Sequence, residues 1–100
     1  MYRNHILRSA RKDIRNAAQW YNDQKPGLGK RFTHYVTKKI ELICENPHIY
    51  QIRRAQMRAA IVPVFPFLIF FNVDEKRRIV SVIGVFHSSL NPQRWQSREQ

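Results

Sequence analysis

The sequence predicts an α+β fold in which a short strand and a helical hairpin pack on an antiparallel β-sheet. Apolar residues in the first half recur at the spacing of amphipathic helices, whereas those in the second half form short runs rich in Val, Ile and Phe. Helices followed by a series of strands are typical of α+β domains. With 100 residues, 43% of them hydrophobic, the chain has the length and apolar content of one domain, so we expect residues 1–100 to form a single unit.

The first expected elements are a short strand over residues 2–7 and a helix that follows it. Ser9 is the expected N-cap, because its hydroxyl can accept a hydrogen bond from a free backbone N–H of the first helical turn. An apolar stripe then recurs at i, i+3, i+4 and i+7. It consists of Ile14, Ala17, Ala18 and Tyr21. Residues 26–29, with the sequence Pro-Gly-Leu-Gly, end this helix.

A second helix is expected over residues 30–45. Its apolar stripe consists of Phe32, Tyr35, Val36, Ile40, Ile43 and Cys44. Asn46 precedes Pro47, and proline disfavours the helical conformation of the residue before it, so the helix should end there. The connection between the two helices is short, which predicts an antiparallel helical hairpin.

Four strands are expected in the second half of the chain. They cover residues 50–54, 57–62, 65–73 and 78–87, with a tight turn at 74–77 between the last two. Alternate residues on both faces of the last two strands are apolar. We therefore expect these two strands to lie centrally in the sheet, with helices covering at least one face.

The chain carries a large excess of cationic side chains. It has 18 Lys and Arg against 7 Asp and Glu, a formal net charge of +11. The cations are spread along the sequence, which indicates a basic face on a folded body rather than a basic tail. Such an excess favours an anionic partner: a nucleic acid, an acidic protein or a membrane surface. The alternative is that the charge only keeps a small protein soluble, although surfaces normally mix both signs more evenly.

Three features predict a soluble protein in the cytoplasm. Cys44 is the one cysteine, so no intrachain disulfide can form. Arg3, Asn4 and His5 interrupt any apolar run of signal-peptide length. The longest apolar stretch, residues 61–71, is far shorter than the ~20 residues that cross a bilayer, so we expect no membrane association.

No motif indicates a metal or a cofactor. The four histidines are far apart, and no cluster of Cys, His and carboxylates has the spacing of metal ligands. Gly27 and Gly29 lie between two helices, whereas a phosphate-binding loop follows a strand. We expect no cofactor, no metal and no small-molecule substrate.

Residues at the ends of the expected elements form a recognisable series. They are Trp20-Tyr21, Pro26-Gly27-Leu28-Gly29, Phe32, Asn46-Pro47, Arg58, Phe65-Pro66-Phe67, His87, Asn91-Pro92, Trp95 and Arg98. In their order and spacing they resemble the RelE/ParE toxin superfamily, especially its ParE-like branch, over nearly the whole chain. The resemblance implies two N-terminal helices on an antiparallel sheet, and an antitoxin that wraps and inhibits the toxin.

The resemblance implies one of two activities. The RelE branch cleaves messenger RNA on the ribosome, which would make this chain a metal-independent endoribonuclease. The ParE branch blocks DNA gyrase without being a nuclease. RelE-type nucleases commonly use a C-terminal tyrosine, and here no tyrosine follows Tyr50, which favours the ParE-like activity. A third hypothesis, a non-toxic basic nucleic-acid-binding module, lacks a helix-turn-helix or RNA-binding signature.

Candidate site residues differ between these hypotheses. RNA cleavage without a metal needs a base for the 2′-OH proton and cations that stabilise the phosphate. His87 and Arg58 are the candidates for these roles if the protein is RelE-like, although His87 has the alternative of capping the end of a strand. Arginine and tryptophan are enriched at binding hot spots. The candidate target-binding residues are Arg53, Arg58, Arg94, Trp95 and Arg98.

The expected partners are a cognate acidic antitoxin and either DNA gyrase or the ribosome with its messenger RNA. An antitoxin for a chain this basic should carry an acidic, partly disordered segment. We expect that segment to lie as a helix or a strand along an apolar groove or a sheet edge. Trp95 has the alternative role of fixing the C-terminal tail to the body of the protein.

Overall fold

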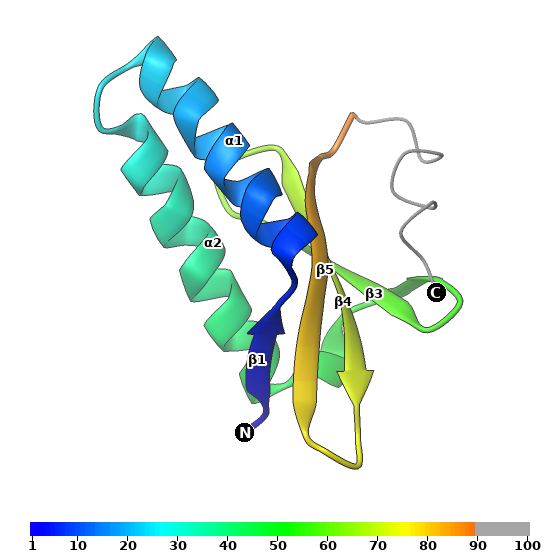
Figure 1. Ribbon diagram of the computed structural model, residues 1–100. Helices are drawn as coiled ribbons and strands as arrows, with labels where there is room; N and C mark the ends of the chain where they lie inside the picture. The colour runs from blue at the N-terminus through cyan, green and yellow to red at the C-terminus, as the bar shows by residue number, and fades with distance from the viewer. Residues whose placement is uncertain (90–100) are drawn as a thin grey trace.

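The computed structural model describes residues 1–89 and has the α+β architecture that the sequence predicts (Figure 1). Two helices cover one face of a five-stranded sheet. The elements are β1 (Arg3–Ile6), α1 (Arg8–Gln24), α2 (Leu28–Glu45), the short 3₁₀ helix η1 (Pro47–Ile49), β2 (Ile52–Arg54), β3 (Met57–Ile61), β4 (Phe67–Asp74) and β5 (Ile79–His87).

The sheet is mixed, with the strand order β1-β5-β4-β3-β2. Strands β2 to β5 form the predicted antiparallel series, and β4 and β5 lie centrally with β3. β1 instead pairs with β5 in parallel, from Arg3 opposite Ile79 to Ile6 opposite Val82. The expectation of an antiparallel sheet therefore holds for four strands, and the first strand adds a parallel edge. A parallel neighbour is possible here because long connections separate β1 from β5 in the chain.

Helix α1 begins two residues after β1 and lacks the predicted cap. Its N-cap is Leu7, which makes no side-chain capping bond. Ser9 lies inside the helix, and its hydroxyl donates a 3.0 Å hydrogen bond to the carbonyl of Ile83 in β5. The prediction of Ser9 as the N-cap was therefore wrong. Ile83 has no partner in β4, because Phe70 pairs with Gly84 and Phe71 with Val82, so this bulge offers an acceptor that Ser9 satisfies.

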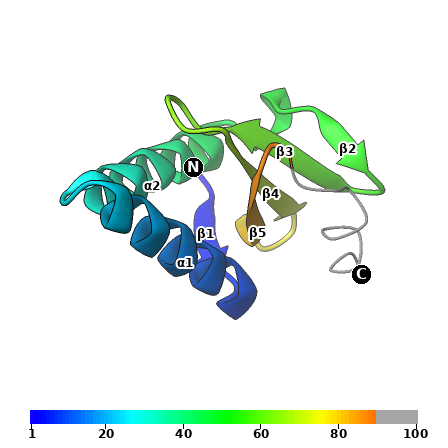
Figure 2. The same cartoon turned by 90° about the horizontal axis from the view of Figure 1, so that it is seen from above.

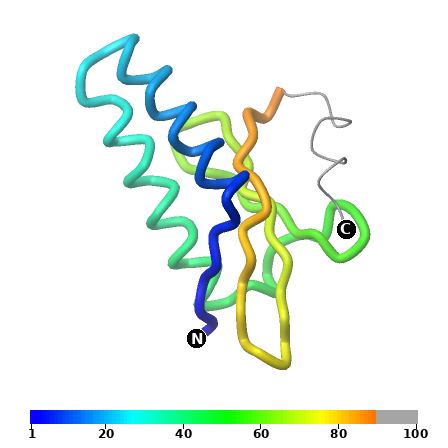
Figure 3. Tube along the Cα trace, in the orientation of Figure 1, coloured from blue at the N-terminus to red at the C-terminus, as the bar shows by residue number. Residues whose placement is uncertain are grey.

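Two glycines allow the tight helical hairpin, whose antiparallel arms lie side by side in Figure 3. Gly27 makes the turn with φ of 91°, a conformation that favours glycine, and its N–H donates a 2.8 Å hydrogen bond to the side chain of Asn22. Gly29 lies against the backbone of α1, where a Cβ would overlap the carbonyl oxygen of Ala18. The helices can approach this closely only because position 29 has no side chain.

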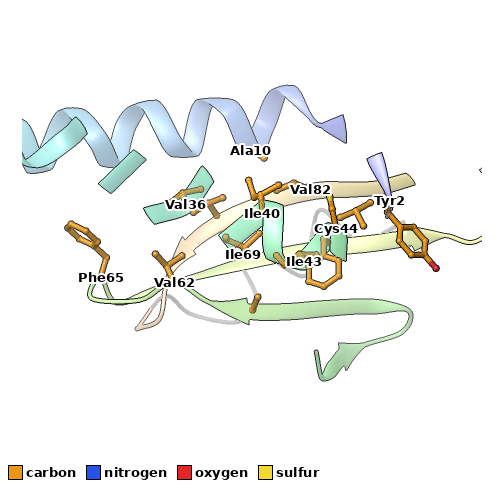
Figure 4. Packing of buried hydrophobic residues seen from close by; sticks show 14 of the residues in the cluster. Tyr2, Ala10, Val36, Ile40, Ile43, Cys44, Val62, Phe65, Ile69 and Val82 are labelled. Carbon is orange, nitrogen blue, oxygen red and sulfur yellow. The ribbon is translucent and has the colours of Figure 1, made fainter. Parts of the chain in front are cut away.

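The main core lies between the helices and the sheet (Figure 4). The predicted stripe of α2 faces this core, and its buried members are Phe32, Val36, Ile40, Ile43 and Cys44. Tyr35 is half-buried beside them. Full burial of side chains of this size stabilises the fold by about 1.5–3 kcal/mol each. Burial also raises the pKa of the Cys44 thiol, because it disfavours the thiolate.

A smaller apolar cluster occupies the opposite face of the sheet. Its buried members are Met57, Ala59, Phe70 and Phe86. Along β4, Ile69 and Phe71 belong to the main core while Phe70, between them, belongs to this second cluster. Both faces of the central strand are thus apolar, as predicted, although both helices lie on one side of the sheet (Figure 2).

Candidate functional site

An apolar groove lies between α1 and the adjoining ends of β4 and β5. It has a volume of about 600 Å³. Most of its wall is apolar, formed by Ala17, Trp20, Tyr21, Phe67, Val85 and Phe86. We call it the α1–β5 groove. An open groove with aromatic walls is a shape that suits a macromolecular partner's apolar side chains.

Trp20 stands at this groove as a large exposed aromatic side chain. It is 59% exposed, and its ring contacts that of Tyr21 edge-on, with centroids 5.1 Å apart. The Tyr21 ring in turn packs edge-on against the rings of Phe65 and Phe67. Burial raises the pKa of Tyr21. Trp20 therefore has a rigid aromatic support on one side and solvent on the other. Tryptophan is one of the residue types enriched at binding hot spots.

Asp13 contributes the acidic group of the α1–β5 groove. Its Oδ2 accepts a 3.0 Å hydrogen bond from the backbone N–H of Val85. This bond spans 72 positions of the sequence and joins α1 to β5 just after the bulge at Ile83. The carboxylate thus holds the wall of the groove in place.

His87 lies at the end of β5 and also lines the α1–β5 groove. It is exposed, and its ring packs edge-on against Phe67 at a centroid distance of 5.3 Å. Its Nδ1 accepts a 3.1 Å hydrogen bond from the N–H of Ser89 and lies 2.7 Å from the Ser89 hydroxyl. In the neutral ring the proton is then on Nε2, and the lone pair of Nδ1 is already engaged. The ring therefore caps the end of β5, one of the two roles considered from the sequence.

Arg58 lies in β3 and supports the backbone of the preceding segment. One of its Nη atoms donates a 2.6 Å hydrogen bond to the carbonyl of Tyr50 and a longer one, 3.4 Å, to that of His48. These bonds hold η1 and the start of β2 against the sheet. A guanidinium used in this way fixes the fold locally.

Arg58 and His87 are not brought together. Arg58 is opposite Phe71 and His87 is opposite Phe67, with β4 between them. Four residues correspond to ~13 Å along the strand, and two strand spacings of ~5 Å each separate the residues in the perpendicular direction. The strand register therefore holds Arg58 and His87 apart on the sheet, and their catalytic roles stay a prediction.

The remaining predicted target-binding residues have two different outcomes. Arg53 is exposed on β2, the edge strand of the sheet. Arg94, Trp95 and Arg98 lie outside residues 1–89, the part of the chain that the structure describes.

A polar cluster at the far end of the sheet was not anticipated. The Tyr2 hydroxyl donates a 2.8 Å hydrogen bond to Glu75, whose other carboxylate oxygen contacts Nε2 of His48. The guanidinium of Arg78 lies 4.2 Å from the centre of the Tyr2 ring. The hydrogen bond to Glu75, and then burial, raise the pKa of Tyr2. The cluster joins the N-terminus to η1 and the β4–β5 turn, segments too distant in the sequence for any local pattern to connect them.

The groove residues were missed for a different reason, although the sequence contained a signal. Trp20 lies outside the apolar stripe of α1, on a side otherwise polar, and Asp13 is the one carboxylate among the cations of the first three turns. These two residues, which break the pattern of α1, both line the α1–β5 groove.

Within residues 1–89, no group of three or more His, Cys, Asp and Glu side chains is placed to hold a metal ion. No helix in this range has the length and apolarity to cross a membrane.

Comparison with known proteins identifies the family. The family described as ParE toxin of type II toxin-antitoxin system, parDE, matches residues 5–92. The chain belongs to the ParE toxin family. It is accordingly a toxin of a type II toxin–antitoxin system. Among curated proteins, no relative matches the sequence of this ParE-family toxin.

Solved structures similar to this ParE-family toxin come from both branches of the superfamily. One, described as the chromosomal ParDE toxin–antitoxin system from P. aeruginosa, has a TM-score of 0.76 at 12% identity, covering 87% of this chain and 96% of that one. The isolated E. coli RelE toxin has a TM-score of 0.68 at 16% identity, with coverages of 97% and 95%. The intact E. coli RelBE toxin–antitoxin complex has a TM-score of 0.67 at 17% identity, covering 90% of this chain and 100% of that one. At these identities the similarity concerns the fold.

Proposed function

We propose that this toxin inhibits DNA gyrase by binding it, and that a cognate antitoxin neutralises it. The observation that carries the proposal is the match to the ParE family over residues 5–92, since the ParE branch is the one that blocks gyrase. The absence of any tyrosine after Tyr50 supports the same branch.

The geometry of the predicted catalytic residues also supports action by binding. A general base needs a free lone pair, and the Nδ1 lone pair of His87 accepts from Ser89. The guanidinium of Arg58 donates to the Tyr50 carbonyl and lies two strands from His87. Cleavage of RNA requires the two groups to act on one phosphate, and this arrangement does not favour it.

For the contact with gyrase we propose Arg53 together with the C-terminal residues Arg94, Trp95 and Arg98. Arg53 is exposed on β2, an edge strand of the sheet, where a charged side chain can reach a partner without any change of fold. Arginine and tryptophan supply large contact area and strong hydrogen bonds at protein interfaces. Arg58 was a member of this set, and we now assign it to support of η1.

We further propose that the antitoxin places an amphipathic segment in the α1–β5 groove. The groove offers the apolar surface that a protein partner needs, and Trp20 is exposed within it. The toxin's net charge of +11 makes an acidic antitoxin the electrostatically complementary one. Two of the similar structures described above also contain an antitoxin, ParDE and RelBE by their names.

A supercoiling assay with purified gyrase and relaxed plasmid tests the proposal. Increasing toxin should abolish supercoiling, and addition of the antitoxin should restore it. Supercoiling that continues at saturating toxin would overturn the proposal. The matched control is the toxin–antitoxin complex formed beforehand, which should leave gyrase active.

One observation favours the alternative, an mRNA endonuclease. The exposed ring of His87 lines an open groove, a position from which a histidine can reach a bound chain. Primer extension on transcripts from arrested cells distinguishes the two activities. New cleavage sites that vanish in a His87→Ala variant would establish the endonuclease, and intact transcripts would exclude it. Harmless expression without the antitoxin would instead favour a non-toxic basic binding module.

A further inference from the structure

A second groove runs along the solvent side of the helical hairpin, between α1 and α2. It consists of two adjoining depressions, of about 330 Å³ and 260 Å³, that share Ile14, Arg15 and Thr33 in their linings. We call it the helix groove. Gly29 lines it where α2 lies against the Ala18 carbonyl. Helix α1 thus separates two different surfaces, the apolar α1–β5 groove and the helix groove.

The helix groove has cationic and hydrogen-bonding walls. Its polar lining residues are Arg11, Arg15, Gln19 and Asn22 from α1, and Lys30, Thr33 and Thr37 from α2. No carboxylate occurs in the lining of either depression. The Thr33 hydroxyl donates to the Gly29 carbonyl and the Gln19 amide donates to Asp23. The groups that the lining presents to an anion are therefore mainly the cations, Arg11 and Arg15 from α1 and Lys30 from α2.

None of the four carboxylates of the helical hairpin lines the helix groove, and three of them have hydrogen-bond or ion-pair partners of their own. Asp13 accepts from the N–H of Val85 on the other flank of α1. Asp23 accepts a 2.8 Å hydrogen bond from Gln19, and Glu41 pairs with Lys38 at 3.7 Å. The charge of the helix groove is accordingly not balanced by acids in its lining.

Several positive charges lie close together at the N-terminus of α1, where the helix dipole disfavours cations. Arg8, Arg11, Lys12 and Arg15 occupy its first two turns, and the first turn holds no acidic residue. Cations are disfavoured at a helix N-terminus, by about 0.3–1 kcal/mol each when exposed. Like charges four residues apart repel by about 0.2–0.5 kcal/mol per pair. Within the described part of the chain, Arg8, Lys12 and Arg15 form no ion pair, so an external anion would relieve this repulsion.

We propose that the helix groove binds the sugar–phosphate backbone of a nucleic acid. Guanidinium groups bind phosphate oxygens in a bidentate geometry, and Lys, Thr, Gln and Asn are the other side chains that commonly contact phosphates. Arg11 and Arg15 are one turn apart, ~6 Å along α1, so they can hold phosphates of one strand while Lys30 reaches from the opposite wall. This binding does not depend on which protein the toxin inhibits.

The composition of the helix groove favours a nucleic acid over an acidic protein segment. A protein segment gains most of its affinity from apolar anchors, and the α1–β5 groove is the surface that offers them. In the helix groove the large aromatic anchors are missing, and its apolar lining residues lie among cationic and polar ones. These apolar residues are Ile6, Ile14, Ala18 and Ile40. The two flanks of α1 therefore fit two different partners.

Fluorescence anisotropy with a labelled duplex DNA and a labelled duplex RNA tests this proposal. The full-length toxin is titrated at several salt concentrations. The test variant Arg15→Gln/Lys30→Gln removes two charges from the helix groove. The matched control Lys76→Gln/Arg77→Gln removes two charges from the exposed β4–β5 turn, so both proteins carry the same net charge. Circular dichroism verifies that each variant is folded.

The wild-type toxin should bind with an affinity that falls steeply with salt. The test variant should bind about tenfold more weakly or worse, and its salt dependence should lose about two units of slope, one for each phosphate contact removed. The control should retain the wild-type slope.

Equal losses of affinity and salt slope in both variants would overturn the proposal, because they would show that net charge alone drives binding. Displacement of the duplex by polyglutamate at equal charge concentration would also overturn it, in favour of an acidic protein. Binding confined to the DNA or to the RNA probe would support the proposal and identify the nucleic acid.

Discussion

The carboxylate of Asp13 in α1 accepts a 3.0 Å hydrogen bond from the backbone N–H of Val85 in β5. Val85 is the second residue after Ile83, the bulged residue that has no partner in β4. Asp13 and Val85 both line the α1–β5 groove, so this bond sets the position of one wall relative to the other. A backbone irregularity in the sheet and a lone acid on a basic helix thus together shape the surface that we assign to the antitoxin.

Replacement of Asp13 should show how much this bond contributes. Asp13→Ala leaves the partly buried N–H of Val85 without this acceptor, and we expect the free energy of unfolding to fall by about 1–3 kcal/mol. Asp13→Asn keeps a carbonyl oxygen at the same position and should lose less. Urea denaturation of the two variants and the wild type measures both changes. Equal stability of all three proteins would contradict the role given to this bond.

Arg58 is expected to stabilise the fold rather than to act on a substrate. Arg58→Ala removes the hydrogen bonds to the carbonyls of Tyr50 and His48 and should lower the free energy of unfolding by about 1.5–3 kcal/mol. Arg53→Ala is the matched control, because Arg53 is exposed on the neighbouring strand and its loss should cost less than about 0.5 kcal/mol. Urea denaturation is the measurement. An Arg58→Ala variant as stable as the control would show that these bonds contribute nothing.

Trp20 should be an anchor for the antitoxin. Its ring is 59% exposed, so Trp20→Ala should leave the stability of the toxin nearly unchanged. A hot-spot residue contributes about 2 kcal/mol or more, which corresponds to about a 30-fold weaker Kd for the antitoxin. Isothermal titration calorimetry with the cognate antitoxin measures the change, and Gln24→Ala, exposed at the end of the same helix, is the control. An unchanged Kd would place the antitoxin elsewhere.

Stability should fall at alkaline pH. Burial raises the pKa of Tyr21, Cys44 and Tyr50, and the hydrogen bond to Glu75 followed by burial raises that of Tyr2. In each case the folded pKa lies above the unfolded one, about 8.5 for cysteine and 10 for tyrosine. Below these values both states hold the proton and the contribution to stability is complete. Above them the unfolded state loses the proton first, so the free energy of unfolding decreases as pH rises through the folded pKa.

A series of urea denaturations from about pH 7 to pH 11 measures this decrease. Cys44→Ala serves as the control, because it removes the part of the decrease that begins near the cysteine pKa of about 8.5. A free energy of unfolding that stays constant over the whole range would contradict the assignment.

The fold was predictable where local periodicity determines burial. The stripe of α2 predicted the buried positions Phe32, Val36, Ile40 and Ile43 correctly, because one face of a helix must pack on the sheet. The alternation in β4 and β5 likewise predicted their central place. The parallel pairing of β1 with β5 was not predictable in this way, since partners such as Arg3 and Ile79 are at opposite ends of the chain and share no local signal.

The candidate site was less predictable than the fold, because it depends on strand register. The sequence supplies Arg58 and His87 as chemically suitable residues, yet their separation follows from the pairing of β3 and β5 with β4. The bulge at Ile83 has no pattern of its own, and it also diverts Ser9 from capping α1. Trp20, in contrast, could have been singled out, because a tryptophan outside the apolar stripe of a helix requires an explanation.

The topology of a reporter plasmid in cells that express the toxin alone tests the central proposal most directly. If the toxin binds and inhibits gyrase, gel electrophoresis of plasmid taken soon after induction should show loss of negative supercoiling before growth stops, and co-expression of the antitoxin should prevent that loss. Plasmid that keeps its full supercoiling in cells already arrested by the toxin would contradict gyrase as the target.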